Sequence, residues 1–283
     1  MLRITPVDVA LKLLLIVLPV GYFAVARRAA ADFRDEREAP GGPARRFPLE
    51  RLVFALHLAS VVWLSLRLGA VAAQDGAQTL HLLALALFGV FLWASRGGEA
   101  RALGLFVAGG AFLLEWAAVA LDPARLTATV DGRGALFAVH VLTAVIAAAV
   151  MLLSGCAGLV YLTLERQMRR KTFGLLYSKL PNLAELATLN RRAAGFGFLF
   201  MTAGVNLGIW LAHRDRVKDF SYLDPQVLAT LALWIHFGLV ALPRRVAFVT
   251  GARAAKASAA GFVLLLLTLL VSAIPGLSFH RFS

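Results

Sequence analysis

Two histidines at the ends of apolar segments have the residue type and placement expected of metal ligands. His140 lies near the start of a long apolar run (GALFAVHVLTAVIAAAVMLL), and His280 follows the last one (LVSAIPGLSFHRFS). A neutral imidazole binds iron well, and two imidazoles that meet at a membrane surface would hold a haem from both faces. We therefore take His140 and His280 as candidate axial ligands of a haem iron near the outer face of a membrane.

Two further histidines lie closer to the middle of apolar segments. His57 and His236 are predicted at depths that differ by only about 5 Å. Ionisable side chains inside a bilayer are expensive and usually face a partner or a cavity. The pair is therefore a candidate for a second, deeper haem site. The alternative, given equal weight, is that each ring forms hydrogen bonds with neighbouring backbone or with Ser60 and Thr230.

Charged and polar residues elsewhere in the apolar segments have simpler interpretations beside the functional one. Arg67 would suit the propionates of an outward haem, because a guanidinium pairs well with a carboxylate. It would equally extend to the outer headgroups, or form a structural ion pair with Glu115. His81 and His213 stand at segment ends, where interfacial anchoring is the expected role.

The composition requires lipid as the main solvent for this chain. Of its 283 residues, 60% are hydrophobic and 16% are charged, and the mean hydropathy is +0.76. Soluble domains carry about 25% charged residues. An integral membrane protein follows. The single cysteine, Cys156, excludes an internal disulfide, and the chain has no CxxC motif of a thiol-redox relay.

The apolar runs predict an all-α, polytopic bundle that forms one unit over residues 1–283. At about 20 residues per membrane crossing, eight transmembrane helices are expected. They are predicted at 6–26, 50–73, 79–95, 102–121, 135–163, 193–212, 226–242 and 258–276. The GVNLG stretch around Asn206 in the sixth helix is typical of close helix packing.

The basic residues predict how the bundle is oriented. Most of the 29 Lys and Arg residues fall in alternate connections, around 27–51, 96–101, 164–192 and 244–256. The positive-inside rule places these connections in the cytoplasm and both termini outside. Anionic lipid headgroups are the natural partner of the net charge of +13, and no basic groove interleaved with aromatic residues indicates nucleic-acid binding. Residues 164–190 suggest an interfacial amphipathic segment that Pro181 interrupts, with Asn182 as a helix cap.

Residues 135–283 resemble the integral membrane cytochrome c assembly proteins of the CcsA/ResC type, and more closely their HemX-like and YpjD-like relatives. The resemblance rests on four stretches: FAVHVLTAVIAAAVMLL with the basic continuation YLTLERQMRRK, KLPNLAELATLNRRAAGFGFLFMTAGV, LDPQVLATLALWIHFGLVA, and the terminal GLSFHRF. Residues 1–130 fit the eight-helix layout with little specific signal. Where the family carries a tryptophan-rich segment, this chain reads KDFSYLDP, with Phe220 and Tyr222 as its aromatic residues.

The resemblance implies haem as a cofactor, with His140 and His280 as its axial ligands. It also implies haem handling in cytochrome c assembly or haem biogenesis at the bacterial cytoplasmic (inner) membrane, with other maturation or haem-synthesis proteins as partners. Two alternatives remain open. One is a regulatory membrane subunit that binds no haem and docks a cytoplasmic partner through 164–192. The other is a transporter, although no inverted repeat or pair of broken helices supports it. No nucleophile–base pair or phosphate-binding loop predicts an enzyme.

Overall fold

A computed structural model shows an all-α protein. It describes residues 6–34, 48–69, 71, 76–97, 100–121, 134–172, 174, 177, 179–216, 220–241 and 251–273. The described residues form eight α-helices and two short 3₁₀ turns, η1 and η2. The elements are α1 (Pro6–Arg34), α2 (Pro48–Leu68), α3 (Gly76–Ala94), η1 (Ser95–Gly97), η2 (Arg101–Leu103), α4 (Gly104–Leu121), α5 (Ala135–Arg169), α7 (Leu183–Arg214), α8 (Pro225–Ala241) and α10 (Gly251–Ala273).

Each of the eight predicted apolar segments falls on one of these helices. Five of the helices are long and apolar enough to cross a membrane, namely α2, α3, α5, α7 and α10, and two shorter apolar ones are α4 and α8. The chain is therefore a multi-pass membrane protein. Its orientation, with both termini outside, stays a prediction from the charge distribution.

The helix ends differ from the predicted spans mainly where charged residues continue a helix. Helix α5 reaches Arg169 and α7 already begins at Leu183. The two ends of the 164–190 segment therefore belong to α5 and α7, and the interfacial role predicted for its middle stays a prediction. Arg, Glu, Leu and Ala are good helix formers, so the helices extend beyond their apolar parts. The predicted cap is confirmed, since the side chain of Asn182 accepts a hydrogen bond from the Glu185 amide at 2.9 Å.

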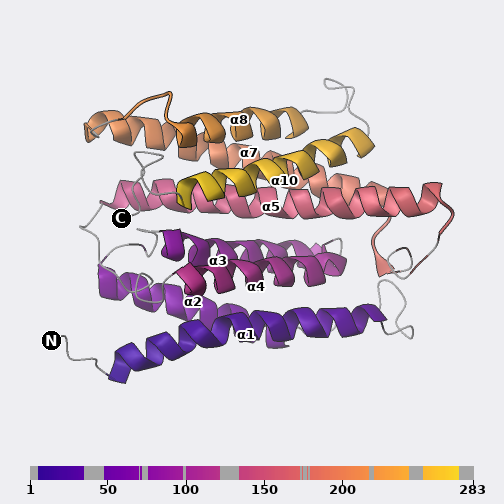
Figure 1. The fold of residues 1–283 in the computed structure, drawn as a ribbon, viewed down its shortest axis with the longest axis horizontal. Helices are drawn as coiled ribbons and strands as arrows, with labels where there is room; N and C mark the ends of the chain where they lie inside the picture. The colour runs from indigo at the N-terminus through magenta and orange to yellow at the C-terminus, as the bar shows by residue number, and fades with distance from the viewer. Residues whose placement is uncertain are drawn as a thin grey trace.

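The helices pack in two groups that meet at α5 (Figure 1). Helices α1 to α4 contact one another, as do α5, α7, α8 and α10, and α3 packs against α5 between the groups. One hydrophobic core runs through both groups, from Tyr22 and Phe88 to Met151 and Phe237. The bundle therefore holds its polar side chains between helices, where they must find partners within the protein.

A buried polar cluster connects α5, α7 and α10 through hydrogen bonds. Ser154, Asn190 and Ser258 are each at most 1% exposed. The Asn190 amide donates to the Ser154 carbonyl at 3.0 Å, and the Ser258 hydroxyl donates to Asn190 Oδ1 at 3.0 Å. Gly158 permits this close approach, because a Cβ there would lie 2.8 Å from the Ala255 carbonyl oxygen. Small side chains and satisfied hydrogen bonds thus hold these three helices together.

Asn190→Ala should destabilise the protein by about 1 to 3 kcal/mol, because it leaves buried hydrogen-bonding groups of Ser154 and Ser258 without their partner. Thermal unfolding of the detergent-purified protein measures this loss. Asn206→Ala on the same helix is the matched control, since the exposed Asn206 amide only donates to the Thr202 carbonyl of its own helix. Equal unfolding temperatures for the two variants would contradict the role of the cluster.

Candidate functional site

His140 lies one and a half turns into α5 and is held by α7. Its Nδ1 is 2.9 Å from the carbonyl oxygen of Gly204. A carbonyl oxygen only accepts, so Nδ1 carries the proton and the lone pair of the neutral ring is on Nε2. Iron-ligating histidines are commonly held in this way, with the second ring nitrogen fixed by a carbonyl. The half-buried imidazole of His140 is therefore held in one orientation, and its role as a ligand stays a prediction.

Gly208 provides the space that the His140 ring occupies. A Cβ at Gly208 would lie 2.7 Å from Cε1 of His140 and 3.1 Å from its Nδ1. One turn earlier, Gly204 packs against Thr143 and Ala144 of α5. The prediction that the GVNLG stretch packs closely against another helix is confirmed at both glycines, while Asn206 between them is exposed.

An aromatic group lies at the end of α7, five residues beyond Gly208. The exposed His213 packs against Phe220 and Tyr222, with ring centroids 5.5 and 6.1 Å apart, and its Nδ1 binds the Ile209 carbonyl. Five helical residues correspond to about 7.5 Å. Phe220 and Tyr222 thus lie at the same end of α7 as His140. The exposed position of His213 agrees with an interfacial anchor.

The structure does not bring His57 and His236 together. His236 is on α8, and its Nε2 lies 2.6 Å from the Ala257 carbonyl oxygen of α10. His57 is on α2, in the other group of helices (Figure 1). The bond of His236 to backbone matches the alternative weighed for it from the sequence. The second predicted ligand, His280, lies outside the described residues, so its convergence with His140 stays a prediction.

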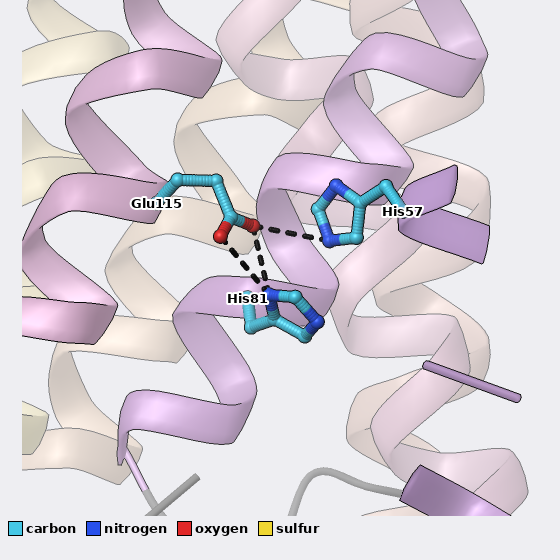
Figure 2. A group of neighbouring side chains, drawn as sticks. All are labelled: His57, His81 and Glu115. Atoms are coloured by element: carbon cyan, nitrogen blue, oxygen red, sulfur yellow. Dashed lines mark hydrogen bonds and ion pairs between the residues drawn. The ribbon is translucent and has the colours of Figure 1, made fainter. Parts of the chain in front are cut away.

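The apolar segments of the first group converge on a site that the sequence did not predict. His57 of α2, His81 of α3 and Glu115 of α4 point toward one another, and all three are 0% exposed (Figure 2). Glu115 Oε1 lies 2.9 Å from His81 Nδ1 and 3.0 Å from His57 Nε2. The interfacial role predicted for His81 is wrong, because the ring faces the interior between α2, α3 and α4 rather than the surface.

Two neighbouring hydroxyl groups complete this cluster. Tyr22 Oη of α1 is 2.7 Å from His57 Nδ1, and Ser60 Oγ is 3.1 Å from His81 Nε2. Ser60 Oγ also donates to the His57 carbonyl oxygen at 2.6 Å. Glu115, weighed from the sequence as a partner of Arg67, thus contacts two imidazoles, and Arg67 is exposed in the last turn of α2. The cluster therefore links all four helices of the first group.

The signal that could have found this cluster was the presence of three ionisable residues in apolar helices. His57, His81 and Glu115 each carry a large burial cost that only a partner offsets. His57 and Ser60 also share a helix face at three-residue spacing. Sequence alone does not show which helices are neighbours, so it could not select the three from the other polar residues.

The fold and these polar side chains define a multi-pass helical membrane protein with histidines held in defined positions. A family model described as cytochrome C assembly protein matches residues 50–280. The chain belongs to that family, and membership implies a role in cytochrome c maturation or haem handling. A comparison with curated proteins gave no match.

Glu115→Ala should destabilise the protein by about 3 kcal/mol, because it removes the buried carboxylate that His57 Nε2 and His81 Nδ1 both face. Thermal unfolding in detergent measures the effect. Glu165→Ala, which removes the exposed Glu165–Arg169 pair at the end of α5, should change the unfolding temperature little. An effect of Glu115→Ala no larger than that of Glu165→Ala would show that the cluster does not stabilise the first four helices.

Proposed function

We propose that this protein binds haem near the outer face of the bacterial cytoplasmic membrane and handles it during cytochrome c maturation or haem biogenesis. The observation that carries the proposal is the hydrogen bond from His140 Nδ1 to the Gly204 carbonyl, which leaves Nε2 with its lone pair. His140 is one axial ligand in this proposal and His280 the other. Arg67 is the candidate partner of a propionate.

Haem supplies an iron whose two axial positions accept imidazole nitrogens. The protein supplies ligation and an apolar surface, and in this proposal the chain is not itself a catalyst. Phe220 and Tyr222, beside His213 at the end of α7, provide aromatic surface at the same end as His140. The closer HemX-like assignment and the cytochrome c maturation or haem-synthesis proteins as partners are part of the same proposal.

A regulatory subunit that binds no haem is the second candidate. The observation in its favour is the basic run at the end of α5, where Arg169, Arg170 and Lys171 are all exposed. Such a run suits a cytoplasmic partner with acidic groups, or anionic headgroups. A partner whose binding depends on these three residues and not on His140 would favour this candidate.

His140→Ala should strongly weaken the Soret band of the protein purified from haem-replete cells, because an axial ligand is lost. His280→Ala should have the same effect. His236→Ala is the matched control, since His236 binds the Ala257 carbonyl in our structure and has no ligand role in the proposal. A colourless wild-type protein, or an unchanged spectrum for His140→Ala, would contradict the proposal.

Gly208→Ala should weaken haem binding without removing any ligand. The added methyl group would lie 2.7 Å from His140 Cε1, so the ring has to move away from its position beside α7. Gly195→Ala on the same helix is the control, because a Cβ at Gly195 has no atom within 4 Å. Titration of both purified variants with haem, followed at the Soret band, compares their affinities. Wild-type affinity for Gly208→Ala would show that the position of the His140 ring does not matter for haem.

A further inference from the structure

The proton positions in the His57–His81–Glu115 cluster follow from its hydrogen bonds. Ser60 Oγ has a single hydrogen and donates it to the His57 carbonyl at 2.6 Å. Toward His81 Nε2, at 3.1 Å, the Ser60 oxygen therefore accepts, so Nε2 carries the ring proton. The lone pair of the neutral His81 ring is then on Nδ1.

This lone pair faces the carboxylate of Glu115. His81 Nδ1 lies 2.9 and 3.1 Å from the two carboxylate oxygens. Two groups that both carry lone pairs repel at this separation, unless a cation lies between them. That cation is either an additional proton or a metal ion.

The surroundings of His57 favour a metal ion over an additional proton as this cation. Its Nε2 lies 3.0 Å from Glu115 Oε1, yet this fully buried nitrogen has no hydrogen-bond partner of suitable geometry among the described residues. A proton between His81 and Glu115 would leave His57 Nε2 without a partner. A metal ion would take the His57 Nε2 lone pair as a ligand, while Nδ1 donates its proton to Tyr22 Oη at 2.7 Å.

We propose that His57, His81 and Glu115 bind a divalent transition-metal ion distinct from haem. One potential ligand atom of each residue lies within 4.8 Å of those of the other two. Two imidazoles and one carboxylate are a ligand set of Zn²⁺ sites with a further open position, and also suit Fe²⁺. Ligand atoms around a tetrahedral zinc ion lie about 3.3 Å apart, as follows from metal–ligand bonds of about 2.0 Å. The two Glu115–imidazole contacts of 2.9 and 3.0 Å would widen by a few tenths of an ångström, and the ligand atoms of His57 and His81 lie within 4.8 Å of each other.

The surroundings provide what a metal site needs beyond its three ligands. With the ion at Nε2 of His57 and Nδ1 of His81, the other nitrogen of each ring would donate its proton, to Tyr22 Oη from His57 and to Ser60 Oγ from His81, which would fix both rings. The buried Glu115 carboxylate would offset part of the metal charge. Tyr22 itself is held by edge contact with Phe88, with ring centroids 5.0 Å apart. All four helices of the first group thus contribute to one centre.

The test uses the full-length protein purified in detergent through a tag free of histidine. The protein is stripped with a chelator, loaded with Zn²⁺ and desalted, and zinc per chain is measured by mass spectrometry. We expect about one zinc ion per wild-type chain. Glu115→Gln and His81→Ala should each weaken binding by more than ~10-fold, and Tyr22→Phe by ~10-fold through the loss of the His57 partner. His213→Ala, which removes an exposed histidine, should bind zinc as the wild type does.

A measurement on the wild type alone keeps the proposal testable if the variants fail to fold. Loading with Co²⁺ should produce visible absorption bands that Zn²⁺ then abolishes. Zinc far below one equivalent in the loaded wild type, the absence of cobalt bands, or wild-type zinc content in a folded Glu115→Gln protein would each overturn the proposal. None of these readouts depends on haem, so failure here is separate from failure at His140.

Discussion

The absence of water between apolar helices is the constraint on which the rest of this structure depends. A polar side chain placed there must find its partner within the protein, because lipid offers none. The histidines between helices illustrate this: the buried His57 and His81 and the half-buried His236 contact side chains or carbonyl groups of other helices. The polar contacts therefore help to determine the helix packing, since each contact requires two particular helices to be neighbours.

The two groups of helices differ in how their histidines find partners. In the first group, His57, His81 and Glu115 come together in one centre, and the hydroxyl groups of Tyr22 and Ser60 complete it. In the second group, His140 and His236 are each held at one ring nitrogen by a carbonyl of a neighbouring helix. A single carbonyl contact orients a ring and leaves its other nitrogen for a ligand. A closed cluster instead gathers several ligand atoms around one point.

The sequence predicted the approximate positions of the eight helices that the described residues form, because apolar run length is a local property. It also predicted the Asn182 cap and the close packing around GVNLG, which depend on residues adjacent in the chain. It failed for His81, because a histidine at the end of an apolar run looks the same whether it faces headgroups or other helices. It paired His57 with His236 by depth alone, although depth carries no information about which helices are neighbours.

The family match covers the three ionisable residues of the buried cluster but not the whole cluster. The family match begins at residue 50, so it includes His57, His81 and Glu115 but not Tyr22. Tyr22 lies on α1, and its hydroxyl group is the partner that fixes the His57 ring. If the centre serves the function of the family, α1 contributes an element outside the matched region.

A purely structural cluster would tolerate replacement of its three ligands by a well-packed apolar set, since buried ionic groups often stabilise less than apolar residues of similar volume. The presence of two imidazoles and a carboxylate at one point, each at a burial cost, therefore favours the proposed metal ion over a role in packing alone.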